Sequence, residues 1–358
     1  MTEGNTNIVI DIGSGSCKAG LSGDENPSVI FPTCLGYFVG ETIDKDTDYK
    51  LSYPVQNGYI KNYDDLGKIL DHIFTKKLKV DAMKSNILFP EAANNPKENR
   101  QKLIEFMFEK FEIGGFYLSS QAFLTLCTEG MTTGMVLGSG EGVTQFVPIY
   151  EGYTIPQAII RLNVGGGDVN NYLEKIIFKK GEHPSIPDQR KRSIIKDLKE
   201  KACYVALNIE EELKSVKPFE YELPDKTKVL IKEERIKAPE VLFNLPMIGK
   251  NNGIGEECFN AFQKCDIDTK KTLYNNIILS GGNTMFNGFI DRLSQELKFM
   301  VPASMKDEIN VSGSPERIYS AWQGGSILSS VATFESNWIT RKEYYEFGPD
   351  KVQEKIVQ

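Results

Sequence analysis

Two short glycine-rich turns, each following an apolar run, carry residue types that could bind a phosphate chain. Residues 11–15 read Asp-Ile-Gly-Ser-Gly, and residues 138–142 read Gly-Ser-Gly-Glu-Gly. Backbone N–H groups point into such turns and no side chain blocks an oxygen, so two facing turns could hold phosphates from both sides. A metal ion between them would take a carboxylate from each turn. Only the first turn begins with an acid, Asp11, so one expected carboxylate is missing.

Two further glycine clusters are candidates for close contact with a ligand. Residues 165–167 are three glycines that precede Asp168 and a predicted helix, and residues 281–288 contain three glycines after a predicted strand. Glycine lets the backbone approach a ligand without a Cβ in the way. We therefore expect up to four loops to face one site.

The elements that must position these turns follow from hydrophobic periodicity and from turn residues. Strand–turn–strand units occur twice and helices follow each, which predicts a duplicated α/β architecture without duplicated sequence. Residues 41–50 are polar and predict a loop. The expected strands cover 7–10, 18–21, 146–150, 157–162 and 274–280, the expected helices cover 64–74, 96–111, 121–127, 165–177, 187–206, 289–298 and 324–331, and a hairpin covers 214–237 with its turn at Pro224 and Asp225.

Composition limits the class of protein. The 358 residues carry a net charge of −7, with 40% hydrophobic and 25% charged residues, which predicts a globular protein of two domains and argues against a nucleic-acid binder. The six cysteines include no CxxC pair and there are only two histidines, so a zinc site, a histidine triad and a disulfide framework are not expected. No signal peptide or membrane span is predicted. The basic run 190–192 predicts either a solvated helix start or a partner contact.

Several segments in the same order resemble actin, from about residue 7 to the C-terminus. They are Asp11–Gly20, Gly142–Tyr153, Lys199–Leu207, Asn276–Phe286 and Pro315–Leu328. The resemblance implies an α/β, two-lobed actin/hexokinase/heat-shock-chaperone ATPase fold. In that fold each lobe is a five-stranded mixed sheet with helices, and the nucleotide cleft lies between the lobes.

The resemblance also implies a division of the chain. Residues 1–128 and 313–358 would form the first, larger lobe, with a shortened filament-loop subdomain near 33–55. Residues 129–312 would form the second lobe, with an inserted subdomain at about 165–250.

The site residues that the resemblance implies bind ATP or ADP, with Mg²⁺ or Ca²⁺ held through water by Asp11. The first phosphate loop matches Asp11, Gly13, Ser14, Gly15 and Lys18; the second matches Ser139, Gly140, Glu141, Gly142 and Val143; the adenosine pocket matches Lys199 and Glu200; and the adenine-side loop matches Gly281, Gly282, Thr284, Met285 and Phe286. Gln121 matches the glutamine that positions the attacking water, and Glu141 is a second catalytic candidate. Turn geometry alone is the alternative explanation of the glycines.

Four positions in and around the cleft differ from actin's pattern. Gly138 replaces the aspartate of the second turn, and Gln145 replaces a histidine that helps to activate water; an amide is a poor general base. Ile12 replaces an asparagine behind the first loop, and Ile318 replaces a lysine beside the adenine. Phosphoryl transfer depends on positioning and charge stabilisation, so we expect binding with hydrolysis slow or lost. Enzymatic activity is left open, at most as a slow ATPase, and a folded cleft without nucleotide is the alternative.

Other differences concern assembly. Part of actin's exposed filament-binding loop is missing between Gly36 and Phe38, and the polar segment 247–253 replaces an apolar plug used in filament contacts. Asn57 replaces a commonly modified histidine. These differences predict a protein that polymerises poorly or not at all.

One partner surface matches actin's apolar groove at the base of the larger lobe. Its residues here are Gly130, Thr132, Tyr153, Ile327, Leu328 and Val331. An exposed groove would favour an amphipathic partner helix. The last three have helical spacing, so a buried helix face is an equal alternative.

The function that we expect is an actin-related structural subunit of a larger cytoskeletal complex. Alternatives are an active ATPase switch of the actin family, a nuclear chromatin-remodelling subunit and, less closely matched, a sugar kinase. Expected partners are proteins, such as actin or other actin-related subunits, with no nucleic acid and no membrane. We expect the protein in the cytoplasm and cytoskeleton, including cilium or axoneme, with the nucleus as the alternative.

Overall fold

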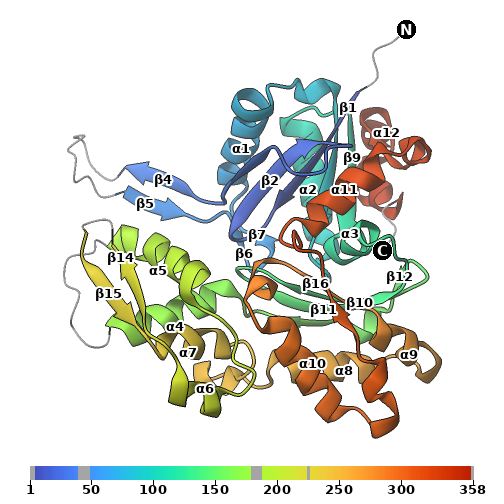
Figure 1. Ribbon diagram of the computed structural model, residues 1–358. Helices are drawn as coiled ribbons and strands as arrows, with labels where there is room; N and C mark the ends of the chain where they lie inside the picture. The colour runs from blue at the N-terminus through green and yellow to red at the C-terminus, as the bar shows by residue number, and fades with distance from the viewer. Residues whose placement is uncertain (1–4, 39–48, 179–187, 224–225, 356–358) are drawn as a thin grey trace.

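The computed structural model describes residues 5–38, 49–178, 188–223 and 226–355. In these ranges two mixed sheets form the centre of the molecule (Figure 1). The first sheet has the order β18-β9-β8-β1-β2-β3. Its strands are β1 (Thr6–Ile12), β2 (Ser16–Leu21), β3 (Val29–Pro32), β8 (Ser85–Glu91), β9 (Gly115–Ser120) and β18 (Ile339–Thr340).

The second sheet repeats this arrangement. Its order is β12-β11-β10-β16-β17, with β13 also paired to β11. Its strands are β10 (Gly134–Ser139), β11 (Thr144–Tyr150), β12 (Tyr153–Thr154), β13 (Ile160–Leu162), β16 (Ile277–Ser280) and β17 (Val311–Ser312). In each sheet an antiparallel hairpin, β1–β2 or β10–β11, lies beside parallel strands. The expected duplication is therefore present.

Each sheet has six strands among the described residues, where five were expected. The difference comes from pieces of two or three residues that pair at an edge. In the first sheet β18 pairs with β9, and in the second β12 and β13 both pair with β11. Strands this short carry almost no periodic signal, so the sequence does not show them.

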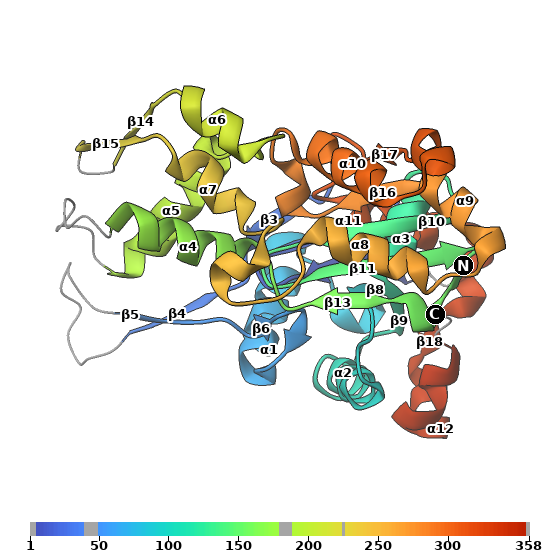
Figure 2. The ribbon, with the colours of Figure 1, turned by 90° about the horizontal axis from the view of Figure 1, so that it is seen from below.

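Helices cover both sheets and form a separate group beside the second (Figures 1 and 2). The helices are α1 (Tyr63–His72), α2 (Lys97–Lys110), α3 (Gln121–Thr128), α4 (Gly166–Phe178), α5 (Asp188–Ala202), α6 (Ile209–Ser215), α7 (Glu234–Glu240), α8 (Ile254–Gln263), α9 (Ile267–Asn275), α10 (Phe289–Met300), α11 (Ser320–Ser330) and α12 (Arg341–Val352). None of the described helices combines the length and apolar character that a bilayer crossing needs.

Three small two-stranded sheets complete the fold. The β4–β5 hairpin projects from the body on the same side as the α4–α7 group (Figure 1), and β5 contacts α5. The bounds are β4 (Leu35–Phe38), β5 (Tyr49–Ser52), β6 (Val55–Gln56), β7 (Tyr59–Ile60), β14 (Phe219–Glu222) and β15 (Lys228–Ile231). The interior of the expected loop 41–50 lies largely outside the described residues.

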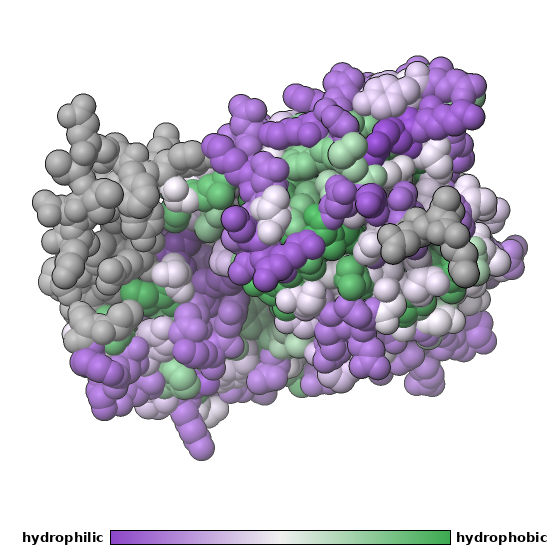
Figure 3. Space-filling model, turned by 90° about the horizontal axis from the view of Figure 1, so that it is seen from above, coloured by the Kyte–Doolittle hydropathy of each residue, from purple (hydrophilic) through white to green (hydrophobic). Residues whose placement is uncertain are grey.

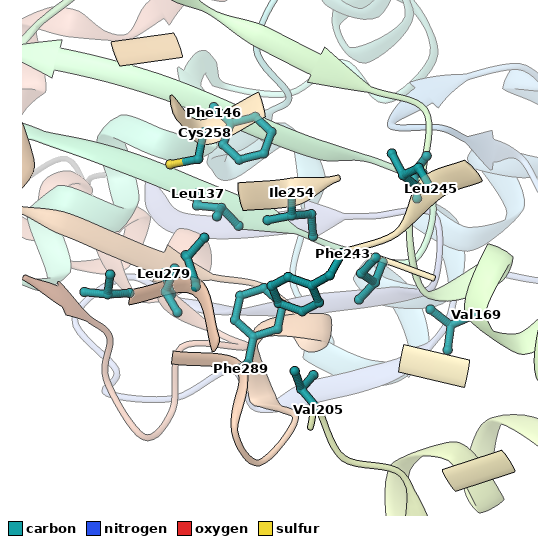
Figure 4. Packing of buried hydrophobic residues seen from close by; sticks show 14 of the residues in the cluster. Leu137, Phe146, Val169, Val205, Phe243, Leu245, Ile254, Cys258, Leu279 and Phe289 are labelled. Atoms are coloured by element: carbon teal, nitrogen blue, oxygen red, sulfur yellow. The ribbon is translucent and has the colours of Figure 1, made fainter. Parts of the chain in front are cut away.

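Two large apolar cores stabilise the sheets. The larger packs α4, α5, α8 and α10 against the second sheet, and the other packs α1 and α2 against the first. In the larger core the rings of Phe243 and Phe289 lie 5.2 Å apart between centroids, with Val205 beside Phe289 (Figure 4). The outer surface seen from above is mostly hydrophilic, with smaller apolar areas between (Figure 3). All six cysteines are free.

Most of the expected elements are present, and two regions differ clearly. The strand expected over 157–162 is a 3₁₀ turn, Pro156–Ala158, followed by β13, because a proline begins that turn. The region 214–237 contains a hairpin, but its ends belong to α6 and α7. Asn208 caps α6 by accepting from the Glu210 and Glu211 N–H groups, which starts a helix where alternation suggested a strand. The turn expected at residues 224–225 lies outside the described residues.

Candidate nucleotide-binding cleft

A cleft of about 460 Å³ lies between the two sheets, and both glycine turns line it. The turns are in close contact: a Cβ added at Gly15 would lie 2.7 Å from Glu141 Cβ, and one added at Gly142 would lie 2.9 Å from Ser14 Oγ. Ser14 Oγ also accepts a hydrogen bond from Gly58 N, at 2.9 Å. Glycine is therefore needed where the turns meet.

The cleft contains open space where three other glycines line it. A Cβ at Gly138, Gly140 or Gly282 would have no protein atom nearer than 3.9 Å. Gly281 has φ of +90°, and its Cβ would lie 2.4 Å from Ser139 O, so only glycine fits there. The backbone thus surrounds a space that a ligand could enter.

Strand register shows which positions of the two turns are equivalent. Asp11 pairs with Lys18 across β1–β2, and Gly138 pairs with Gln145 across β10–β11. Each pair comes directly before the last pair of its hairpin, and in both hairpins four residues lie between the last paired residues, 13–16 and 140–143. Gly138 therefore occupies the position of Asp11 in the second turn, and the missing carboxylate is missing at that structural position.

Asp11 is nearly buried and is held by two neighbours. Lys18 Nζ lies 3.1 Å from Asp11 Oδ2, and Gln121 Nε2 donates to Asp11 Oδ1 at 3.2 Å. Gln121 begins α3, directly after β9, and this position aims its amide at the end of β1. The structure therefore brings together three of the residues expected at the phosphate end.

A second amide extends this chain of hydrogen bonds. Gln145 Nε2 donates to Gln121 Oε1 at 3.4 Å, and Gln145 Oε1 accepts from Ala93 N at 2.8 Å. Gln145 is buried. Each amide therefore has a protein partner for its oxygen and for its nitrogen. Lys18, Asp11, Gln121 and Gln145 form one continuous chain of hydrogen bonds, which we call the relay.

Arg161 is a residue that the sequence did not single out. It lies opposite Gln145 in the β11–β13 pair, so both side chains share one face of the sheet. Its guanidinium donates to Ala93 O at 3.0 Å and to Asn57 O, and it lies 4.0 Å from the Tyr59 ring centroid. Burial lowers the pKa of Arg161. This arginine ties the second sheet to the segment after β8 and to the β6–β7 hairpin.

Glu141 does not reach the gap left at Gly138. Its carboxylate accepts from Asn170 Nδ2 at 3.3 Å and lies 3.9 Å from Lys199 Nζ and 3.6 Å from Arg192 Nη2. Burial lowers the pKa of Lys199, although Glu141 opposes that shift. The carboxylate therefore belongs to the α5 side of the cleft and does not replace the missing acid.

Arg192 also contacts the segment after β5. Its guanidinium lies 4.2 Å from the ring centroid of Tyr53, which follows β5. The α5 helix is thereby joined to the β4–β5 region. Lys196 and Glu200 of α5 line the cleft, and their charged groups lie 4.0 Å apart.

The opposite end of the cleft is built by the loop after β16. Gly281, Gly282, Met285, Phe286 and Ile318 line it, as expected. Thr284 does not line the cleft, because its buried hydroxyl donates to Gly281 O at 2.7 Å and accepts from Arg317 Nε.

Asn283 is a further residue that the sequence did not single out. Its Nδ2 donates to Ser139 Oγ at 3.0 Å and to Gly140 O at 2.7 Å. Asn283 therefore ties this loop to the second turn.

The whole length of the chain agrees with one family. A family model described as Actin matches residues 2–357. The chain belongs to the actin family. Members of this family generally bind a nucleotide and a divalent cation. The two-lobed α/β fold expected from the sequence is thus confirmed.

The donor set fits a nucleotide better than it fits a metal ion. Among the described residues no group of three or more His, Cys, Asp or Glu side chains is placed to hold a metal. Glu91 lines the cleft, but it bonds Arg100 and Asn95, and burial raises its pKa. Asp11 remains to hold a hydrated cation, whose role would be to neutralise phosphate charge.

Only some residues of the expected partner groove are exposed. Tyr153, Ile327 and Val331 are exposed, whereas Leu328 is partly buried and packs against the small core around Trp322. Gly130 has a positive φ, and Thr132 O accepts from Gly152 N. The alternative of a wholly buried helix face is wrong, because Ile327 on α11 and Val331 directly after it are exposed.

Proposed function

We propose that this protein is an actin-related structural subunit that binds ATP or ADP in the cleft and hydrolyses it slowly or not at all. The observation that carries the proposal is the relay from Lys18 through Asp11 and Gln121 to Gln145. It keeps the phosphate clamp ordered and at the same time occupies the groups that would act on a water molecule.

Binding is supported by the parts of the site that remain intact. Both turns face the cleft and Lys18 supplies a positive charge. Apolar walls are offered by Met285 in the loop after β16 and by Ile318 in the segment before α11. Backbone N–H groups and a lysine bind phosphate without help from the missing acid. The nucleotide would stabilise the closed arrangement of the lobes by mass action.

Slow hydrolysis is expected because the hydrogen-bond chain from Lys18 to Gln145 already occupies the acceptors that a water molecule would need. An attacking water needs an oriented acceptor for its proton. Gln121 Oε1 already accepts from Gln145, and Asp11 already accepts from Lys18 and Gln121. Gly138 provides no second carboxylate, and Glu141 is engaged elsewhere. Loss of one electrostatic contribution of this kind slows a reaction by about 10²–10³.

Assembly into a complex, rather than into a filament of this chain, is supported by the segment that replaces the plug. Lys250 Nζ donates to Asn163 O at 2.6 Å and lies 3.3 Å from Asp168 Oδ1. The segment is therefore fastened to its own lobe by a cation instead of presenting an apolar tip. The exposed residues of the partner groove, Tyr153, Ile327 and Val331, are where we place an amphipathic helix of another subunit.

The proposed setting is a cytoskeletal complex in the cytoplasm, which can include actin or other actin-related subunits. An active ATPase switch is the alternative that the intact Asp11 and Gln121 favour. A nuclear chromatin-remodelling subunit is the alternative for location, and the weak basic run at 190–192 is its basis.

Two measurements test the proposal. Protein purified under native conditions is denatured, and the released nucleotides are separated by chromatography. We expect one adenine nucleotide per chain. Phosphate release is then followed after adding labelled ATP. Release as fast as that of filamentous actin would refute the structural assignment, and absence of nucleotide would remove the cofactor.

A further inference from the structure

A second hollow, of about 550 Å³, lies outside the cleft and shares no lining residue with it. Three elements enclose it: the segment that leads into α6, the first turn of α8, and α10. We call it the α10 groove and define it by Leu207, Glu210, Glu256, Arg292, Glu296 and Phe299.

One face of α10 forms a wall of this groove. Arg292, Gln295, Glu296 and Phe299 all line it, and their spacing of three, four and seven residues places them on one side of a helix. Phe299 is 86% exposed, and Leu207 across the groove is 51% exposed. A large aromatic side chain this exposed loses favourable burial energy unless something covers it.

The floor of the groove is fixed in place by ion pairs. Arg292 binds Glu240 through two nitrogens at 2.9 and 3.0 Å, and its Nε lies 2.6 Å from Glu296 Oε1. The guanidinium also lies 5.0 Å from the Phe243 ring centroid. Gly255 makes this packing possible, because a Cβ there would lie 2.0 Å from Glu296 Oε2. The groove is therefore a preformed surface.

The rim of the groove carries uncompensated negative charge. Arg292 is matched by the two acids that it binds. Glu210 and Glu256 also line the groove, and within the part of the chain that the structure describes neither carboxylate has a hydrogen bond or an ion pair. Burial raises the pKa of Glu296; Arg292 opposes this, whereas Glu240 and Glu256 add to it. A positive charge brought to this rim would be stabilised.

We propose that the α10 groove docks a helix of a partner protein that carries a bulky apolar side chain flanked by lysine or arginine. The apolar side chain would lie between Leu207 and Phe299, and the basic residues would face Glu210 and Glu256. Charge complementarity selects this occupant. A second copy would bring a net charge of −7 to an acidic rim, and a nucleic acid would be repelled. The groove is independent of the nucleotide cleft.

The test uses the full chain and two synthetic helical peptides of about 15 residues. Both peptides have the same phenylalanine and leucine stripe; one has lysines beside it and the other has glutamates. Binding is measured by fluorescence anisotropy. We expect the lysine peptide to bind the unmodified chain and Phe299→Ala to weaken it at least tenfold. Ile267→Ala, which removes another exposed apolar side chain on α9, is the matched control and should leave binding unchanged.

A charge reversal gives a second, independent readout. The double variant Glu210→Lys and Glu256→Lys should reverse the preference, so that the glutamate peptide binds more tightly than the lysine peptide. Both residues are exposed, so the variant is expected to fold, and circular dichroism verifies this. Equal binding of the two peptides, no binding of either, or binding that Phe299→Ala leaves intact would overturn the proposal. So would a dimer, seen by analytical ultracentrifugation, that Phe299→Ala dissociates, because the occupant would then be a second copy.

Discussion

Replacing Arg161 by methionine tests how the two lobes are held together. Methionine keeps the aliphatic stem and removes the guanidinium, so the hydrogen bonds to Ala93 O and Asn57 O are lost together with the stacking on Tyr59. All three contacts join β13 of the second sheet to the first lobe, at the segment after β8 and at the β6–β7 hairpin. We therefore expect the substitution to favour opening of the lobes more than unfolding of either sheet.

The size of the effect follows from these contacts. Two hydrogen bonds from a charged donor contribute about 3 kcal/mol, and the contact with the ring contributes about 1 kcal/mol. Burial lowers the pKa of Arg161. Taking a charged group partly out of water has a cost, which offsets about 2 kcal/mol. The net contribution is about 2 kcal/mol, which corresponds to about a 30-fold change in the opening equilibrium.

Hydrogen exchange followed by mass spectrometry measures this opening directly. We expect the amide of Ala93 to exchange about 30-fold faster in Arg161→Met, since Ala93 N donates to Gln145 Oε1 across the two lobes. Lys250→Met is the control, because its bond to Asn163 O lies within the second lobe. Unchanged exchange in Arg161→Met, or the same increase in the control, would refute the reasoning.

Three further outcomes are expected. Gly138→Asp, which has space because the nearest atom to the new Cβ lies 4.0 Å away, should raise single-turnover phosphate release at least tenfold; an unchanged rate with nucleotide bound would contradict this. Glu240→Gln should lower the free energy of unfolding in urea by about 3 kcal/mol, because Arg292 loses its buried partner, whereas the exposed Glu222→Gln should cost under about 0.5 kcal/mol. Partial burial raises the pKa of Glu343, but hydrogen bonds from Lys355 and Thr340 outweigh burial and lower this pKa to about 2. The contribution of Glu343 to stability is therefore complete above about pH 4.3 and is lost as the pH falls towards 2. The variant Glu343→Gln should flatten the fall of the urea midpoint between these pH values, and an equally steep fall would count against this prediction.

The fold could be predicted because local signals and long motifs agree. The Asp11 and Gly138 turns each follow a buried strand, and their glycines mark the close approach that the structure shows at Gly15 and Glu141. The amphipathic spacing of α1 and α2 predicted those helices to within a few residues. Edge strands such as β18 were missed, because two residues contain no period.

The sequence predicted the glycine turns that line the cleft, but it did not predict the side chains that link the loops around it. Arg161 and Asn283 have no motif around them, and their roles come from strand register and from loops that meet only in the folded chain. The alternation of β11 and β13 could have suggested that Gln145 and Arg161 share a face, but only if the pairing had been known. Thr284 was assigned to the adenine side of the cleft by the resemblance to actin, whereas its hydroxyl donates to Gly281 O inside the loop.

Because the two turns are in contact, the time that a ligand stays in the cleft need not follow from its equilibrium affinity. Gly15 and Gly142 leave no space between the turns, so a ligand whose phosphates were enclosed by both turns would leave on that side only after the turns separate, however weakly it is held. A modest affinity is then compatible with very slow exchange. A nucleotide captured while the protein folds would stay through assembly and would mark the age of the subunit instead of reporting the surrounding ATP concentration.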